Sequence, residues 1–219
     1  MSEIAIFGAG GAGRETAWLA DHCGMKVACL IDDSRELEGT RINGVPVISL
    51  NHFLAISPNV PVLCAIGNPQ ARERVVGKLL KQGANLNCSL IHPSVLIGSH
   101  TEIGRGAIIC PHTIITVNVR IGAFAYVNLS CTIGHDVELG DFCTFTPGVH
   151  VSGTVRFGRR IFVGTGATFI NGTSTKPLSV GDDAVVGAGV CVRRDVRPGT
   201  TLLDAAPRSI AGGGADREF

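Results

Sequence analysis

Aromatic residues are scarce in this chain of 219 residues, at 5% of the sequence, with one tryptophan and one tyrosine. No apolar run approaches the roughly 18 residues that a membrane-spanning helix requires. The chain also has no large excess of positive or negative charge, since its formal net charge is +1. Proteins that coat nucleic acids or adhere to membrane surfaces depend on clustered basic charge. We therefore expect neither nucleic acid nor a membrane among the partners.

We expect no secretory leader here, since the N-terminus reads MSEIAIFGAGGAG, has no basic residues before its apolar run and enters a glycine-rich turn directly. The eight cysteines are scattered and form no CxxC pair. This placement is typical neither of a disulfide framework nor of a zinc site. It favours small thiols, mostly buried, in a protein of the reducing cytoplasm.

The chain has an internal repeat that begins near residue 90. From Ile97 the sequence divides into blocks of six, of which the first are IGSHTE, IGRGAI, ICPHTI, ITVNVR and IGAFAY. The first position is always Ile, Val, Leu or Phe, and the fifth is nearly always small or β-branched. The frame is interrupted by five residues, Thr175–Ser179, and resumes at Val180.

A period of six does not match the face of an α-helix, whose residues turn by about 100° each. It fits a short strand and a corner, repeated three times in a triangular coil, with the first and fifth positions facing inward. Glycine, 29 residues of the chain, would occupy corners with positive φ. We predict a mixed fold: a small N-terminal Rossmann-like α/β domain, then a left-handed parallel β-helix. The predicted domains are residues 1–90 and 91–210, with a mobile tail at 211–219.

Residues 1–90 alternate between strand and helix patterns, which indicates a small parallel sheet. Asn68 is the expected N-cap of the last helix, Pro69 its first residue, and Gly83 follows its end. The expected strands are Ile4–Phe7, Val27–Ile31, Val45–Ile48 and Val62–Ile66, and the expected helices are Glu15–Cys23 and residues 69–82.

Gly8-x-Gly10-x-x-Gly13 lies between a predicted strand and a predicted helix, and Asp32 ends the next strand. This is the setting of a nucleotide-phosphate site at a helix N-terminus. About 90 residues are half of a full dinucleotide fold, so one nucleotide is favoured over NAD. Ile66-Gly67-Asn68 ends a strand at the same sheet edge. The other interpretation is a tight turn beside a solvated Asp32-Asp33.

His135 is the residue in the repeats best suited to proton transfer, because Asp136 follows it at positions that face away from the prism core. An imidazole accepts protons near neutral pH, and a neighbouring carboxylate fixes its tautomer. An ordinary exposed His–Asp pair is the other interpretation. A trimeric prism that holds zinc, as in a γ-type carbonic anhydrase, needs a closely spaced histidine pair, which the repeats lack. We expect no metal.

The whole chain resembles the hexapeptide-repeat acyltransferases of the sialic-acid O-acetyltransferase-like group, which includes bacterial nucleotide-aminosugar N-acetyltransferases. The N-terminal half carries GAGGAGRE, DD and AIGN. The second half carries IGHDVELGDF, PGVHVSGTVRFG, FVGTGA and VVGAGVCVRRDV. The resemblance implies acetyl-CoA as co-substrate, a homotrimer, and a nucleotide-linked amino sugar as acceptor, commonly a 4-amino-4,6-dideoxyhexose, for cell-surface glycan synthesis.

The resemblance also implies roles for particular residues. His135 would be the general base and Asp136 would orient it. The positions that would hold the nucleotide are Gly10, Gly11, Asp32, Asp33, Gly67 and Asn68. The positions that would lie along acetyl-CoA, between adjacent subunits, are Asn128, Gly153, Thr165 and Ala188.

Three features depart from the family pattern. Thr144 stands where a second histidine is often found, residues 175–179 form an insertion expected near the cofactor groove, and the C-terminal motif appears as residues 203–208. Arg193, Arg194 and Arg197 form a basic cluster in the sequence, either for cofactor phosphates or as a solvated rim.

Direct acyl transfer without a covalent intermediate is the predicted mechanism, because the cysteines fall mostly at inward positions. Two alternatives remain open. One is O-acetylation of a sugar or of sialic acid, or acylation of serine, against which the nucleotide-type first domain argues. The other is a non-catalytic or metal-dependent prism, in which His135 and Asp136 are incidental.

Overall fold

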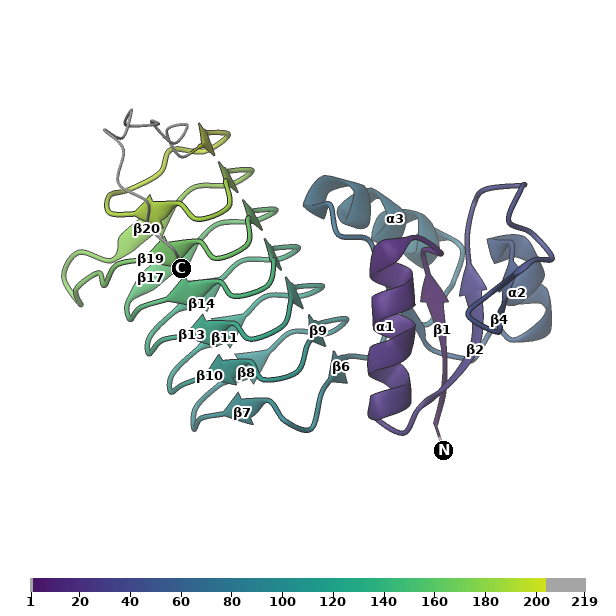
Figure 1. Cartoon of the computed structure of the whole chain (residues 1–219). Coiled ribbons are helices and arrows are strands. Elements are labelled where there is room, and N and C mark those ends of the chain that lie inside the picture. Colours follow the sequence, from purple (N-terminus) through teal and green to yellow (C-terminus); the bar gives the residue numbers. More distant parts are fainter. Residues whose placement is uncertain (1, 204–219) are drawn as a thin grey trace, which may run out of the picture.

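The computed structural model describes residues 2–203 and places a small α/β sheet beside a stack of short parallel strands (Figure 1). The sheet order is β3-β4-β2-β1-β5, with β3 antiparallel to β4 and the other neighbours parallel. Its strands are β1 (Glu3–Phe7), β2 (Lys26–Ile31), β3 (Arg41–Ile42), β4 (Val45–Ile48) and β5 (Val62–Cys64). The helices are α1 (Gly11–His22), α2 (Leu50–Ile56) and α3 (Pro69–Lys81).

Helix α3 is as predicted: the Asn68 side chain accepts a hydrogen bond from the Ala71 N–H at 2.9 Å, and Gly83 has a φ of 80°. Helix α1 begins at Gly11, four residues before the predicted start, because packing against the sheet overrides the low helix propensity of glycine. Helix α2 and strand β3 were not predicted, since both are too short to show a period.

The second part is a parallel β-helix of three sheets, and the predicted fold class is confirmed. The strands are β6 (Leu90–Ile91), β7 (Leu96–Ile97), β8 (Glu102–Ile103), β9 (Ile108–Ile109), β10 (Ile114–Ile115), β11 (Arg120–Ile121), β12 (Tyr126–Val127), β13 (Thr132–Ile133), β14 (Glu138–Leu139), β15 (Thr144–Phe145), β16 (His150–Val151), β17 (Val155–Phe157), β18 (Phe162–Val163), β19 (Thr168–Phe169), β20 (Leu178–Val180), β21 (Val185–Val186), β22 (Cys191–Val192) and β23 (Thr201–Leu202). Ile115 pairs with Ile133 and Ile133 with Val151, so one coil spans 18 residues.

The predicted inward positions form the prism core. Residues at the first and fifth hexad positions, such as Ile133 and Val137, belong to one buried cluster that runs along the stack. Each coil buries aliphatic side chains and adds backbone hydrogen bonds to the next coil, as in other stacked-repeat folds.

Three corners separate the sheets, and a residue with positive φ recurs at each. The first, here named the His135 corner, is marked by His100, Asn118, Asp136 and Thr154. The second, the Phe142 corner, is marked by Gly106, Phe124, Phe142, Arg160 and Asp183. The third, the Gly148 corner, is marked by His112, Ser130, Gly148, Gly166 and Gly189.

The predicted role of glycine at the corners is therefore wrong in part, because many positive-φ positions are not glycine. Glycines at the second hexad position instead allow close stacking. A Cβ on Gly122 would lie 2.6 Å from the Asp141 nitrogen of the next coil, which is too close for real atoms.

The α/β sheet packs against one face of the prism, the sheet of β6, β9, β12, β15, β18, β21 and β23, which we call the covered sheet. Ile108 and Tyr126 on this sheet belong to the same buried cluster as Leu19 of α1. Phe124 and Phe142, at the adjoining corner, join the core beneath α3. The two parts thus share packed side chains.

The insertion begins two residues earlier than predicted. Leu178 pairs with Val155, and the Gly172 N–H donates to the Gly153 carbonyl at 3.0 Å, so residues 173–177 are the extra ones. Val180 pairs with Phe157, so the frame resumes at Val180 as predicted. Only the start of the insertion was wrong, because Leu178 takes the fifth-position inward place that the hexad count gave to Thr173. The predicted tail, 211–219, and the motif at 204–208 lie outside the described residues, and the division near residue 90 stays a prediction.

Candidate functional site

The turn between β1 and α1 has four glycines, of which two are required by the fold and two are not. Gly8 has a φ of 109°, and a Cβ on Gly13 would overlap the Gly8 carbonyl. These two glycines are required by the fold. Gly10 and Gly11 have no other atom within 4 Å of a Cβ position, and neither has positive φ. The packing of the chain therefore does not require glycine at either position. A ligand that binds close to this backbone would require the space that a side chain would fill.

The N-terminus of α1 is suited to an anion. Gly10 is the N-cap and provides no side-chain hydrogen bond to the first turn. Free N–H groups at a helix start, together with the helix dipole, attract phosphate. Asp32 braces this turn: its Oδ2 accepts from the Ala9 N–H and its Oδ1 from the Ser34 N–H, both at 2.9 Å.

Beside Asp32 is a hollow of about 360 Å³ between the end of β2, the start of α2 and the end of α3. Asp33 lies in this hollow and pairs with the Lys78 ammonium, whose Nζ is 2.6 Å from Oδ1. Asp33 is thus a member of an exposed ion pair, and Lys78 is a lining residue that the sequence did not single out. The spacing of 45 residues between the two carries no signal.

Gly67 and Asn68 lie at the same sheet edge after β5. A Cβ on Gly67 would meet no atom within 4 Å, so this glycine also leaves open space. The Asn68 side-chain Oδ1 accepts the capping hydrogen bond of α3, which leaves the side-chain N–H₂ group for a ligand. The predicted nucleotide residues therefore share one edge of the sheet, with Gly10, Gly11 and Gly67 open to solvent space.

The predicted catalytic pair is formed at the His135 corner. The His135 Nδ1 lies 2.8 Å from the Asp136 Oδ2, and the Asn118 side chain donates to the Asp136 Oδ1 at 3.1 Å. Hydrogen bonds from His135 and Asn118 lower the pKa of the Asp136 carboxyl, so it is ionised at neutral pH. An ionised carboxylate places the imidazole proton on Nδ1 and leaves the Nε2 lone pair free.

Gly153 lies directly beyond the His135 ring in the next coil. A Cβ at this position would overlap the imidazole, so glycine leaves the space that the His135 ring occupies. The Gly153 N–H donates to the Asn171 Oδ1 at 2.9 Å. Asn171 was missed by the sequence reasoning, although it follows Gly153 by one full coil of 18 residues.

The other predicted cofactor residues lie at a different corner. Asn128, Thr165 and Ala188 belong to the Gly148 corner, and Thr165 and Ala188 are exposed. The Asn128 Oδ1 accepts from the Leu129 N–H at 2.7 Å, and the Thr165 hydroxyl donates to the Thr146 Oγ1 at 3.3 Å. One chain therefore brings Gly153, but not these three residues, next to His135.

The three predicted parts of the site are separated within one chain. The nucleotide edge belongs to the domain on the covered sheet, and the cofactor residues flank that sheet at the Gly148 corner. The His135 corner joins the two other sheets and is the corner opposite the covered sheet. The geometry within a single chain does not assemble the complete site.

Thr144 lies on β15 of the covered sheet and not at the His135 corner. It is buried between the two domains, where its hydroxyl donates to the Gly67 carbonyl at 2.7 Å and accepts from Arg72 at 2.9 Å. Thr144 thus helps to pack the two domains together. Arg72 was missed by the sequence reasoning, because no local pattern marks a buried arginine.

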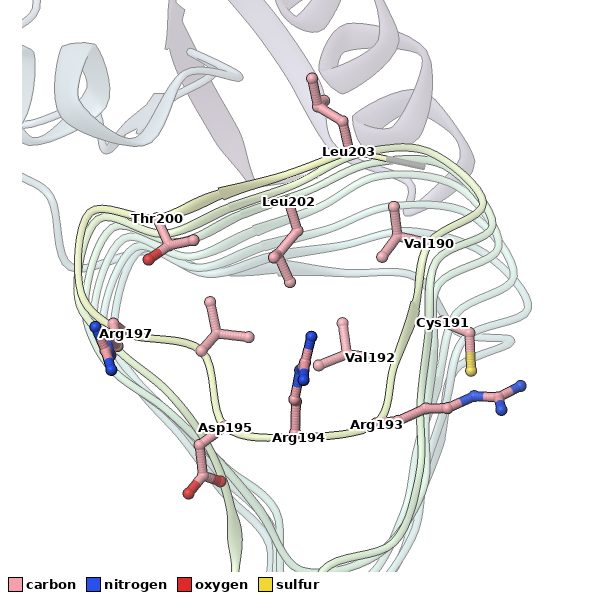
Figure 2. A pocket seen from close by; sticks show the side chains of 11 residues that line it. Val190, Cys191, Val192, Arg193, Arg194, Asp195, Arg197, Thr200, Leu202 and Leu203 are labelled. Atoms are coloured by element: carbon pink, nitrogen blue, oxygen red, sulfur yellow. The ribbon is translucent and has the colours of Figure 1, made fainter. Parts of the chain in front are cut away.

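Residues of the last described coil of the prism line a hollow of about 670 Å³. Figure 2 shows Val192 and Leu202 inside the last coil, with Arg194 pointing inward across it. Arg193 points outward on one side and Arg197 lies on the opposite side. The three arginines therefore do not form one cluster. Arg193 and Arg194 also line a neighbouring hollow of about 450 Å³ with Lys176 of the insertion.

The cysteines are free and mostly buried, as predicted: five are buried, two are partly buried, and Cys191 is exposed. Burial raises the pKa of the Cys64 thiol and of the Cys110 thiol to about 12, which makes them poor nucleophiles. Cys191 differs, since hydrogen bonds with Thr168 and Arg193 and the arginine charge lower its pKa.

Cys191 is accordingly expected to be the first thiol alkylated by iodoacetamide in the folded protein. Brief labelling followed by peptide mass spectrometry should give a single early adduct, at Cys191. The Cys191→Ser variant should lack it. Equally rapid labelling of Cys64 would contradict the packed core that the structure places around this residue.

Among residues 2–203, no cluster of three or more His, Cys, Asp or Glu side chains is arranged to hold a metal ion. Over the same range, no helix is long and apolar enough to span a membrane.

A hexapeptide prism, an oriented imidazole at one corner and an open glycine turn on an α/β sheet are together the features of a hexapeptide-repeat acyltransferase. Comparison with known proteins narrows the class. The model of the PglD N-terminal domain matches residues 3–79. GDP-perosamine N-acetyltransferase of Escherichia coli O157:H7 is 35% identical over 191 residues, 83% of this chain and 84% of that protein.

Solved structures agree with this comparison. WeeI from Acinetobacter baumannii AYE has a TM-score of 0.86 and 33% identity, covering 93% of this chain and 97% of that one. A histidine-to-asparagine variant of perosamine N-acetyltransferase from Caulobacter crescentus, in complex with CoA and GDP-perosamine, has a TM-score of 0.81 and 27% identity, covering 92% and 93%. This chain belongs to the family of bacterial nucleotide-aminosugar N-acetyltransferases, and the predicted resemblance is confirmed.

Proposed function

We propose that this protein transfers the acetyl group of acetyl-CoA to the amino group of a nucleotide-linked amino sugar. The observation that carries the proposal is that Gly10, Gly11 and Gly67 leave ligand space that the fold itself does not require. This space lies on the same chain as an imidazole oriented for proton transfer. The relatives from Escherichia and Caulobacter are named for GDP-perosamine, so a GDP-linked 4-amino-4,6-dideoxyhexose is the first acceptor to test.

In the proposed reaction the neutral sugar amine attacks the carbonyl carbon of the thioester. The His135 Nε2 accepts one amine proton as the C–N bond forms, while Asp136 stabilises the resulting imidazolium. The tetrahedral intermediate then collapses with cleavage of the C–S bond. The proton passes from His135 to the departing sulfur, and the products are an acetamido sugar and free CoA thiol.

The developing oxyanion needs a hydrogen-bond donor close to the imidazole. The Gly153 N–H is adjacent to the His135 ring and is the candidate that this proposal favours. It donates to the Asn171 side chain in this structure, so the Asn171 carboxamide would turn away when the thioester enters. Asn171 is on the exposed surface of the prism and has room for this rotation.

Thermal shift with GDP, UDP, dTDP and CoA tests the two ligand classes. A ligand at one hundred times its Kd stabilises the native state by about 2.7 kcal/mol. Stabilisation by GDP and by CoA supports the proposal, and a larger response to UDP or dTDP changes the nucleotide. A response to CoA without any nucleotide favours O-acetylation of a free sugar. No response to either contradicts the proposal and favours a non-catalytic prism.

We also propose that the enzyme is a homotrimer whose sites are shared between copies. The support is that the His135 corner is opposite the covered sheet, so a chain cannot present this histidine to its own nucleotide domain. In a closed three-fold assembly, the His135 corner of one copy can face the Gly148 corner of the next. Each site would then take the catalytic pair from one copy and the nucleotide edge from its neighbour.

Subunit mixing tests this assembly. His135→Ala and Gly11→Asp chains with different affinity tags are co-expressed, and assemblies that carry both tags are purified. A ring of three mixed copies has one boundary with both native groups, so about one third of native activity should return. No activity in the mixed assemblies, with each variant correctly folded, would mean that each chain completes its own site.

We place the reaction in the cytoplasm and in the supply of sugars for cell-surface glycans. The eight free thiols favour a reducing compartment, and acetyl-CoA is a cytoplasmic metabolite. Fractionation of the source cells, followed by immunoblotting, would test this placement: the chain is expected with the cytosolic markers.

A further inference from the structure

Arg72 is a buried cation with no carboxylate partner among the hydrogen bonds of its guanidinium group. Its side chain comes from α3 and is 1% exposed, the most buried of the charged side chains in residues 2–203. Burial lowers its pKa to about 10, which still leaves the group charged at neutral pH. A buried charge of this kind is costly unless each N–H finds a good acceptor.

The acceptors come from both domains. On the nucleotide side, Nη1 donates to the Ile66 carbonyl at 2.6 Å and to the Gly67 carbonyl at 3.3 Å. On the prism side, Nε donates to the Phe124 carbonyl at 2.9 Å, and Nη2 donates to the carbonyls of Phe142 at 2.8 Å and Cys143 at 3.0 Å. One guanidinium group therefore holds the loop after β5 against two successive coils.

Thr144 closes the same network. Its hydroxyl donates to the Gly67 carbonyl at 2.7 Å and accepts from the Arg72 Nη1 at 2.9 Å. The Gly67 carbonyl thus accepts hydrogen bonds from Thr144 of the prism and from Arg72 of α3. The open space at the Gly67 Cβ position belongs to the same residue. Further along α3, Glu73 forms an ion pair with Arg160 at 3.3 Å, and Arg160 forms another with Asp183 at 2.7 Å.

We propose that Arg72 and Thr144 are positioning residues that set the nucleotide-binding edge at a fixed place on the prism. The inference rests on the proposed function, because its consequence is the alignment of the sugar amine with the thioester. A misplacement of about 1 Å lowers the rate of an aligned reaction strongly. The clamp acts through Gly67 and does not itself touch the reacting atoms.

Thr144→Val and Thr144→Ser form a matched pair for the test. Valine keeps the shape but removes both hydrogen bonds, while serine keeps both. We expect the valine variant to lose about tenfold in kcat, with KM for acetyl-CoA and the thermal shift with GDP within about twofold of native. The serine variant should retain native kcat. Arg72→Lys, which offers one ammonium for several acceptors, should resemble the valine variant.

Two kinetic outcomes overturn the inference. One is native kcat in a folded Thr144→Val variant. The other is a parallel loss of kcat, acetyl-CoA affinity and thermal stability, because that pattern indicates a general structural role. Hydrogen exchange supplies a readout that does not depend on turnover: amides of residues 65–68 and 142–146 should exchange faster in the valine variant than in the serine variant. Absence of turnover in the native protein would contradict the proposed function alone. Equal hydrogen exchange in the valine and serine variants would overturn the proposed positioning role of Arg72 and Thr144.

Discussion

Replacing His135 with alanine is expected to lower kcat at least about a hundredfold, the usual contribution of a general base. The amine must lose a proton as the amide forms, and the imidazole held 2.8 Å from Asp136 is positioned to take it. The His135 side chain is 56% exposed, so its removal opens no cavity in the core. Steady-state rates of thiol release, together with melting curves of both proteins, measure the effect.

His52→Ala is the matched control for this substitution. His52 is an exposed histidine of α2, on the other domain, and has no role in the proposed reaction. The control should keep native kcat and KM. Native kcat in the His135→Ala protein would exclude this residue as the base, while the acetyltransferase activity itself would stand.

Gly11→Asp is expected to abolish the thermal shift with GDP and to raise KM for the nucleotide sugar at least about tenfold. The added carboxylate would occupy the open space where phosphate is proposed, and like charges repel strongly in a site that binds anions. The fold should tolerate the change, because an acidic residue in the first turn of a helix is stabilising by about 0.3–1 kcal/mol. KM for acetyl-CoA should be unchanged.

Two alanine variants separate the ligand effect from the fold. Gly11→Ala should leave the melting temperature equal or higher, since no atom lies within 4 Å of the new Cβ. Gly13→Ala should destabilise the protein by about 1–3 kcal/mol, because its Cβ overlaps the Gly8 carbonyl and the helix must shift. Normal GDP binding by a folded Gly11→Asp protein would contradict a phosphate site at this turn.

Most of the prism could be predicted from the sequence, because apolar or small residues recur at the first and fifth positions of each block of six, and these positions form the core. The hexad count failed only inside the insertion, where Leu178, and not Thr173, takes the fifth-position place opposite Val155. The N-cap and the end of α3 were predicted from Asn68, Pro69 and Gly83. The start of α1 was not, since packing against the sheet decided it.

The site was predictable where its chemistry is local and not where it depends on distant contacts. His135 and Asp136 are adjacent in sequence, and their hydrogen bond follows from that proximity. Lys78 in the hollow beside Asp33, Arg72 at the domain contact and the buried Thr144 depend on tertiary packing, for which one sequence has no signal. The separation of the His135 corner from Asn128 likewise required the three-dimensional structure.

The central claim is N-acetylation, and the most direct measurement is thiol release from acetyl-CoA with a GDP-linked 4-amino sugar, with mass spectrometry of the product. The matched acceptor carries a hydroxyl group in place of the amine. The account predicts stoichiometric CoA thiol and an acetamido sugar from the amine, with no product from the hydroxyl analogue. Acetylation of the hydroxyl analogue, or no product from GDP-, UDP- and dTDP-linked amino sugars alike, would contradict it.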